Sequence, residues 1–445
     1  MRLPDLLATR RGRLLAFFLL YVTEGIPIGF TATAVAAQMR RQGVGPAEIG
    51  VFVGTLYLPW AWKWLMGPFV DVIHSDRLGR RRAWIVAAQM LMAFTLLGTV
   101  GIDFTANLKL FTILIFIVNA FGATQDVAID ALACETLSEH ERGTANGLMF
   151  AGAYCGQAVG GSGALFLAAA IGFQWTYLFV AAAILTVTIF VALPLRETRP
   201  DAPVAREGPW AGAVLREIGE YARQAVRAFF GHRGATVAVV FAVLPCGAYA
   251  LGLALQSNLA VELGLSDSGI GTLALASTII SAVGCVLGGF LSDRLGRRRM
   301  LATYVVLASV PTLIFALLMQ RAGWIMPVDP TLPDRPAVPP SLVTAFWVVC
   351  LVFSFFHGLM YGTRTALFMD VCAKGVAATQ FTAYMSLLNL VIWYTASWQG
   401  IAIERWGYPV TLLIDGLAGL VCLGLLPWIV PRTAKRPCRQ RPWQG

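Results

Sequence analysis

Apolar stretches long enough to cross a bilayer recur along the whole chain, separated by short polar segments. One helical span needs about 20 mostly apolar residues, and the pattern predicts twelve such spans. Their ranges are 14–37, 48–70, 83–102, 108–133, 144–171 and 174–195, then 236–258, 268–291, 300–320, 342–366, 378–401 and 409–430. The sequence therefore predicts an all-α integral membrane protein.

A polar stretch over residues 196–234 divides the spans into two groups of six. We expect an N-terminal six-helix bundle over 1–195, a cytoplasmic linker over 196–234, and a C-terminal six-helix bundle with a basic tail over 235–445. Within the linker, residues 214–230 alternate apolar and charged positions at helical spacing. This amphipathic helix can lie on the inner membrane surface or pack on the cytoplasmic loops, and the sequence leaves both open.

The charged residues agree with a membrane protein. They make up 13% of the 445 residues, whereas soluble domains carry about 25%. The net charge of +10 could indicate nucleic acid, but 26 Lys and Arg lie on the side of the two termini and only six on the other side. Positive residues accumulate on the cytoplasmic side. We therefore expect both termini in the cytoplasm of a bacterial inner membrane, and no nucleic acid.

Candidate enzyme chemistry is missing from the sequence. The eight cysteines and four histidines are scattered without metal-ligand spacing. No phosphate-binding Gly-rich loop or catalytic triad is visible, so we expect no metal, no cofactor and no enzyme. His357, the sole histidine within a span, fits packing better than binding. Five glycines in the fifth span predict close helix packing; they are Gly152, Gly156, Gly160, Gly161 and Gly163.

An octapeptide, SDRLGRRR, occurs twice, at residues 75–82 and 292–299. The copies follow the second and eighth spans, which are equivalent places in two six-helix halves. Duplicated halves are common among secondary transporters, with the substrate held near mid-membrane between them. The repeat therefore indicates two related halves.

The second copy extends to a longer motif that resembles the loop signature of the major facilitator superfamily. The elements are Gly289, Asp293, Arg294, Gly296 and Arg297, and the first half supplies Gly67, Asp71, Arg77, Gly79, Arg80 and Arg81 after an insertion. Glycine lets helices approach closely, and carboxylate–guanidinium pairs can bridge helix ends. We expect a cytoplasmic gate, with a plain positive-inside anchor as the alternative.

The first half also resembles AmpG-type muropeptide permeases and the related acetyl-CoA transporters. The matching stretches fall within residues 24–163 and are 25–27, 58–71, 79–84, 123–131 and 141–147. The resemblance implies the major facilitator fold, with twelve spans in two pseudo-symmetric halves. Glu24 departs from it, because a neutral residue is expected there. Gln125 lies within the matching stretch around Asp126 and joins the candidate site residues.

Carboxylates inside spans are costly and therefore candidates for function. Asp126 and Asp130 are four residues apart, hence on one helix face. Two like charges so close favour a proton held on one of them. We assign Asp126 to proton or substrate work and Asp130 to the gate, where it could pair with loop arginines. Glu24 could neutralise Lys63 or be a second proton site.

Apart from Lys109, at the very start of the fourth predicted span, Lys63 and Arg364 are the two cations within predicted spans, one in each half. Facing one cavity, they could bind an anionic substrate. Snorkelling of the long side chains toward the surface is the alternative, and it suits Arg364 better than Lys63.

Together these features predict a monomeric proton-coupled importer that works by alternating access and uses the proton gradient as its energy source. By resemblance, its small-molecule substrate is an anionic peptidoglycan fragment, an anhydromuropeptide. A siderophore or acyl-CoA is the alternative substrate. A membrane-embedded acyl or phospho transferase is the alternative of another class, and it lacks the catalytic constellation that it would need.

Overall fold

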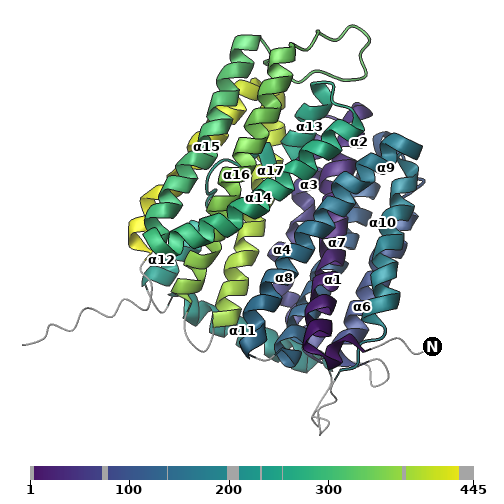
Figure 1. The fold of residues 1–445 in the computed structure, drawn as a ribbon, viewed down its shortest axis with the longest axis vertical. Helices are drawn as coiled ribbons and strands as arrows, with labels where there is room; N and C mark the ends of the chain where they lie inside the picture. The colour runs from purple at the N-terminus through teal and green to yellow at the C-terminus, as the bar shows by residue number, and fades with distance from the viewer. Residues whose placement is uncertain are drawn as a thin grey trace, which may run out of the picture.

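A computed structural model describes residues 5–72, 79–137, 139–197, 210–230, 233–252, 254–372 and 377–429. These residues form helices and connecting loops, and none of them lies in a β-strand. Figure 1 shows the helices as one bundle with two lobes, the first half in purple to blue and the second in green to yellow.

The first half contains six spans, some of them built from several helical pieces. Short π-helical segments, in which the helix widens, continue three of these spans without a loop. The pieces are η1 Leu6–Ala8, α1 Arg10–Gly29, η2 Phe30–Val35, α2 Ala36–Arg41, α3 Pro46–Leu56, α4 Leu58–Ala61, η3 Lys63–Leu65, α5 Met66–Val72, α6 Arg80–Gly98, α7 Phe104–Thr136, α8 Glu139–Ala158, η4 Val159–Gly163, α9 Ala164–Ile171, α10 Gln174–Val187 and η5 Thr188–Ala192.

The second half also contains six spans, preceded by the linker helix α11, Trp210–Phe230. Its pieces are α12 Arg233–Ala242, η6 Ala250–Gly252, α13 Ala254–Glu262, α14 Asp267–Leu295, α15 Arg297–Ala322, α16 Pro340–Val371, α17 Ala377–Ala418 and η7 Val421–Trp428. α17 contains the eleventh predicted span and the first part of the twelfth, which are separated by a kink at Gly407, where φ is +79°. α11 contacts α5 and α17 and so touches both halves.

The predicted spans correspond to these helices. Among the described residues, eight segments are long and apolar enough to cross a membrane, and one of them, Gln380–Trp428, covers the last two predicted spans. The third predicted span is α6. The second and seventh are each divided into shorter helices. The predicted domain limits at residues 195 and 235 stay predictions.

The seventh span is interrupted between α12 and α13. Gly247 has φ of +71°, a conformation that side chains with a Cβ rarely adopt. Interrupted backbone at membrane depth must find internal partners for its polar groups. Here the Asp415 carboxylate accepts hydrogen bonds from the backbone N–H groups of Tyr249 and Ala250, at 2.9 and 3.0 Å.

Glycines bring α1 and α8 into backbone contact. A Cβ added at Gly152, Gly156 or Gly160 would lie 1.9–2.3 Å from a carbonyl oxygen of α1. The facing glycine of α1, Gly25, is equally tight against Ala153. Small residues let helices pack closely where lipid gives no hydrophobic driving force. The predicted role of the glycines in the fifth span is therefore confirmed for this seam.

The apolar core is shared by the two halves at one end of the molecule and is separate in each half at the other end. One cluster takes residues from both halves, including Phe52 and Phe111 of the first and Phe315 and Phe346 of the second. Two further clusters each stay within one half. Both lie toward the end of the molecule where the N-terminus is found (Figure 1). We call the end with the shared cluster the sealed end, and the opposite end, with the N-terminus, the terminal end.

Replacing Gly156 with alanine should destabilise the protein by about 1–3 kcal/mol, the cost of overpacking a tight contact. The new Cβ would lie 2.2 Å from the Val22 carbonyl oxygen, and backbone on both sides prevents relief. Gly98→Ala is the matched control, because nothing lies within 4 Å of its Cβ position. Thermal unfolding of the purified variants measures the difference. Equal melting temperatures for the two variants would contradict the seam.

Candidate functional site

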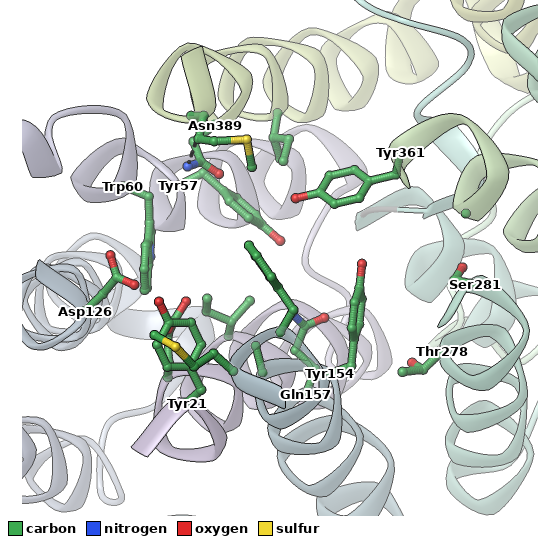
Figure 2. A pocket seen from close by; sticks show the side chains of 18 of the residues that line it. Tyr21, Tyr57, Trp60, Asp126, Tyr154, Gln157, Thr278, Ser281, Tyr361 and Asn389 are labelled. Atoms are coloured by element: carbon green, nitrogen blue, oxygen red, sulfur yellow. Dashed lines mark hydrogen bonds between the residues drawn. The ribbon is translucent and has the colours of Figure 1, made fainter. Parts of the chain in front are cut away.

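A cavity of about 910 Å³ lies between the two halves. Figure 2 shows part of its wall, with Tyr57 and Tyr154 from the first half and Tyr361 from the second pointing into it. The lining reaches Leu137, near the end of α7, and Met369, near the end of α16. The cavity therefore extends toward the terminal end, where the two halves have separate cores.

Four charged residues of the first half line one wall of this cavity: Glu24, Lys63, Asp126 and Asp130. The Lys63 Nζ lies 2.6 Å from the Asp126 Oδ2, and their side chains are only 14% and 3% exposed. Tyr21 donates a hydrogen bond of 2.5 Å to the Asp130 Oδ1. One oxygen of Glu24, Oε2, is buried without a hydrogen-bond partner. We call these four residues the carboxylate cluster.

The interruption of the second span places Lys63. α4 ends at Ala61, Trp62 leaves the helical region with φ of −111° and ψ of 8°, and Lys63 opens the short turn η3. The ammonium thereby reaches α7, a different helix, at Asp126.

Asp126 and Asp130 both line the cavity, one turn apart on α7. The described partner of Asp130 is the Tyr21 hydroxyl, not a loop arginine, so the structure places Asp130 in the cavity wall rather than in a gate contact. The hypothesis that Glu24 neutralises Lys63 is not what the geometry shows either, because Asp126 holds that ammonium.

Gln125 points away from the cavity. Its amide donates to the Thr23 hydroxyl at 2.9 Å and to the Leu20 carbonyl at 3.3 Å. The Gln89 amide donates to the same Thr23 hydroxyl at 3.0 Å. Gln125 therefore connects α7 to α1 and α6 and is not among the lining residues.

Arg364 lies behind the opposite wall. Its side chain is 3% exposed, its Nη1 donates to the Tyr249 hydroxyl at 2.9 Å, and its guanidinium lies 5.4 Å from the centre of the Tyr361 ring. Tyr249 and Tyr361 line the cavity, whereas Arg364 does not. The expectation that Lys63 and Arg364 both face the cavity is thus wrong for Arg364 in this state. A buried guanidinium does not snorkel.

His357 also lines the cavity and stacks on Phe353, with ring centres 5.4 Å apart and an interplanar angle of 25°.

Asp415 is a buried charge that the sequence interpretation missed. Besides the two backbone N–H groups in the seventh span, it accepts a hydrogen bond of 2.7 Å from the Gln399 amide. It lies inside the twelfth predicted span, so the rule that flagged Asp126 applies to it equally. Its contacts are structural, because they hold the interrupted span that carries Tyr249.

The two copies of the octapeptide bridge helix ends within each half. Arg297 contacts Asp293 at 2.8 Å and Asp370 at 2.5 Å, and thereby connects α14, α15 and α16. In the first copy Arg81, one register position later, contacts Glu135 at 2.9 Å and the Val70 carbonyl at 3.0 Å. Both bridges join the ends of neighbouring helices within a half.

The remaining motif residues are placed differently from expectation. Gly79 and Gly296, equivalent in the two copies, have φ of +100° and +96° and start α6 and α15. Arg294 stacks on Phe290 at 4.0 Å, and the backbone N–H of Arg80 donates to Glu197. The Asp71 side chain and Arg77 lie outside the described residues.

Close helix approach at the motif glycines is not seen. Nothing lies within 4 Å of a Cβ built at Gly67 or Gly289. The expectation that these glycines let helices touch is wrong for this state, because both lie toward the terminal end, where the halves have separate cores.

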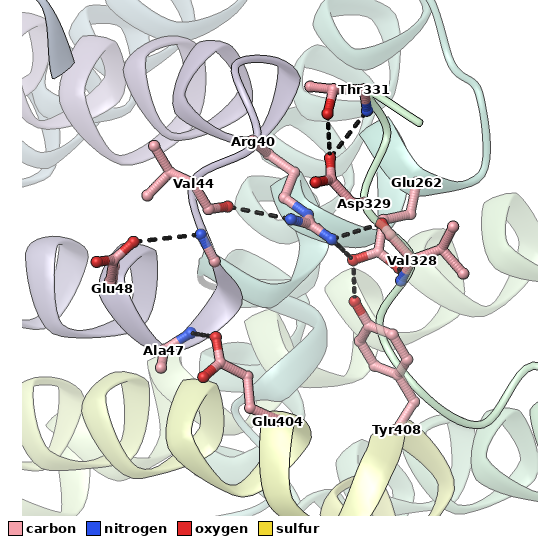
Figure 3. Close-up of polar contacts among 11 residues, drawn as sticks. Arg40, Val44, Ala47, Glu48, Glu262, Val328, Asp329, Thr331, Glu404 and Tyr408 are labelled. Carbon is pink, nitrogen blue, oxygen red and sulfur yellow. Dashed lines mark hydrogen bonds and ion pairs between the residues drawn. The ribbon is translucent and has the colours of Figure 1, made fainter. Parts of the chain in front are cut away.

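A buried ion pair closes the sealed end and was also missed. Arg40 donates two hydrogen bonds, of 2.6 and 3.1 Å, to the Glu262 Oε1, and the two side chains are 3% and 0% exposed (Figure 3). Tyr408 donates to the same oxygen at 2.5 Å, and Arg40 also donates to the Val44 and Val328 carbonyls. We call Arg40, Glu262 and Tyr408 the outer lock. It joins α2 of the first half to α13 and α17 of the second.

Further contacts surround the outer lock. Arg41 pairs with Asp267 at 2.8 Å, and the Ala47 N–H donates to Glu404 at 2.9 Å. Two hydrogen bonds from Thr331 to the nearby loop carboxyl of Asp329 lower its pKa, so that this group stays ionised. Arg40 and Glu262 lie just beyond the ends of the first and seventh predicted spans, where charged residues are ordinary. The sequence therefore did not indicate that they form a pair.

A charged cavity between two six-helix halves is typical of a membrane transporter. The family model described as the Major Facilitator Superfamily matches residues 14–396 and 237–445, so the chain belongs to that family.

Among curated relatives, the anhydromuropeptide permease of Escherichia coli (strain K12) is 26% identical over 412 residues, which cover 91% of this chain and 77% of the permease. Putative transporter AmpG 4 of Rickettsia conorii is 23% identical over 428 residues, 94% of this chain and 96% of that protein. The family resemblance read from the sequence is therefore confirmed and extends along most of the chain.

Solved structures share the fold at low identity. A D-xylose–proton symporter superimposes with a TM-score of 0.70 at 12% identity, covering 95% of this chain and 98% of the symporter. A bacterial homologue of the human lysosomal transporter Spinster, in an inward-facing and unoccupied conformation, gives a TM-score of 0.64 at 15% identity and covers 94% of each chain. The predicted fold class is confirmed.

Removing one member of the Lys63–Asp126 pair should cost more stability than removing both. Lys63→Met leaves a buried carboxylate unpaired, which costs up to about 3–5 kcal/mol. The double variant Lys63→Met/Asp126→Leu should recover most of that loss. Thermal unfolding of the purified proteins checks this order, and a double variant less stable than Lys63→Met would contradict the pairing.

Breaking the outer lock should open the sealed end. Arg40→Gln leaves Glu262 buried without its cation and should shift the population toward longer distances between spin labels at Gln42 and Asp334, exposed positions in the two halves. Arg41→Gln is the matched control, because its pair with Asp267 is 31% and 26% exposed and such pairs contribute little. Equal distance distributions for the two variants would contradict the role of the outer lock.

Proposed function

We propose that this protein is a proton-coupled secondary transporter that imports peptidoglycan-derived anhydromuropeptides across a bacterial inner membrane. Family membership and the permease-named relatives support transport of a small solute. The protein uses the proton gradient as its energy source, needs no cofactor and works as a monomer. A siderophore or acyl-CoA is the alternative substrate within the same family.

The charge distribution supports an orientation in the membrane. The excess of Lys and Arg near the termini assigns the terminal end to the cytoplasm. On that assignment the structure is an inward-facing state, with the outer lock on the periplasmic side. Solute bound in the outward-facing state leaves through the terminal end when the halves rock.

The carboxylate cluster is the observation that carries the proposed coupling. It holds three carboxylates and one ammonium in the cavity wall, and Lys63 is paired with Asp126. The unpartnered oxygen of Glu24 needs a hydrogen, because a buried polar atom without a partner is costly. A proton on Glu24, beside Asp126, supplies that hydrogen. The proton binds when the cavity faces outward, and the inward-facing arrangement seen here is the one before its release to the cytoplasm.

Uptake of labelled anhydromuropeptide into proteoliposomes tests the proposal. With the outside one pH unit more acidic, one-proton coupling can drive up to about tenfold accumulation. Asp126→Asn should abolish accumulation. Glu24→Gln, which mimics the protonated form, should lose gradient-driven accumulation and keep exchange of internal for external solute. Glu220→Gln, on the exposed face of α11, is the matched control.

The outcomes separate substrate from coupling. Accumulation that does not respond to the gradient in the wild type would overturn proton coupling and keep the substrate. No uptake or exchange by correctly oriented wild-type protein would overturn the muropeptide assignment. Siderophores and acyl-CoA would then be tested in the same vesicles.

A further inference from the structure

Each half contributes one buried cation at or behind the cavity wall, and the two cations differ in whether a carboxylate neutralises them. In the first half, Lys63 has three carboxylates around it and contacts one of them at 2.6 Å. In the second half, Arg364 has the Tyr249 hydroxyl as its described hydrogen-bond partner, and its Nε is buried without any. None of the ion pairs among the described residues includes Arg364.

Asp415 is not the missing counter-ion. One of its oxygens accepts the backbone N–H groups of Tyr249 and Ala250, and the other accepts the Gln399 amide. Asp415 holds the segment that carries Tyr249 and leaves the guanidinium without an anion, among the described residues. A buried charge without a counter-ion is unfavourable and persists where function requires it.

Arg364 is one side-chain layer from the cavity. Tyr249, His357 and Tyr361 line the cavity, and Tyr249 and Tyr361 contact the guanidinium directly. Tyr154 lines the first-half wall of the same cavity. Figure 2 shows the Tyr154 and Tyr361 hydroxyls turned toward the same space. Tyr249 lies in the interruption of the seventh span, outside a regular helix.

We propose that Arg364 is the anion-binding group of the cavity and that a substrate carboxylate displaces the Tyr249 hydroxyl from it. A carboxylate accepts two parallel hydrogen bonds from a guanidinium, whereas a tyrosine hydroxyl accepts one and carries no charge. Lys63, already neutralised by Asp126, serves the carboxylate cluster and does not bind the substrate anion. This inference rests on the proposed function for its ligand, a solute with a carboxylate.

Binding of two matched probes to the purified protein tests the inference. The probes are an anhydromuropeptide with free carboxylates and the same molecule with every carboxyl converted to a carboxamide. The wild type should bind the acid at least about tenfold more tightly, which corresponds to about 1.4 kcal/mol. Arg364→Gln should bring the affinity ratio close to one. Arg321→Gln, at the exposed end of α15, removes the same charge and should keep the ratio.

Two further variants keep the test decisive if Arg364→Gln folds poorly. Tyr249→Phe removes the hydroxyl that competes for the guanidinium, and it should tighten acid binding and leave amide binding unchanged. Lys63→Met/Asp126→Leu removes the neutral pair and should keep the preference for the acid. Loss of that preference in the Lys63 double variant, or its persistence in Arg364→Gln, would overturn the inference.

Failure of the inference and failure of the proposed function give different results. A wild type that binds acid and amide equally overturns the anion site and leaves the muropeptide assignment intact. If neither probe binds, N-acetylmuramate and coenzyme A are measured next. Binding of one of these that is lost in Arg364→Gln overturns the muropeptide assignment and supports the anion site. No binding of any of these anions overturns both.

Discussion

The apolar cluster that both halves share at the sealed end is the constraint on which the rest of the structure depends. Toward the other end each half has its own core, so the halves can separate there without exposing a common interior. The cavity exists because of this division. Enclosed in the shared core, Arg40 and Glu262 satisfy each other and several backbone groups. A buried pair of this kind adds little stability, but it is strongly unfavourable to leave one member alone. The outer lock therefore makes separation of the sealed end an all-or-none event rather than a gradual one.

Much of this architecture was predictable, because span length and charge bias are local properties. The ranges of the spans, the division into two halves and the amphipathic linker helix all follow from composition along the chain. The charged cavity residues were also flagged, since a carboxylate or an ammonium inside an apolar run is conspicuous. Their partners were not predictable. Lys63 meets Asp126 across 63 positions and Arg40 meets Glu262 across 222, and no feature near either residue specifies the other. Asp415 was missed although the same rule covers it.

The repeated octapeptide shows how far identical local sequence determines structure. Its glycine adopts a positive φ in both copies and starts the next helix in both, which is a property of the local chain. The arginine that bridges to neighbouring helices differs by one register position: Arg297 in one half and Arg81 in the other. The two copies thus share their backbone conformation at the glycine but differ in which arginine contacts the neighbouring helix.

Each half also contains a hydrogen bond between a tyrosine and a charged residue, and no shared sequence motif predicts it. In the first half, Tyr21 of the first span hydrogen-bonds Asp130 of the fourth. In the second half, Tyr249 of the seventh span hydrogen-bonds Arg364 of the tenth, the equivalent pair of spans. In each half a tyrosine thus hydrogen-bonds a charged residue, which is a carboxylate in the first half and a guanidinium in the second. If Arg364 binds the substrate anion as proposed, the cavity would hold a molecule with charge at one end in one orientation, with that end at the second-half wall. Rocking of the halves would preserve that orientation, because each charge moves with its own half.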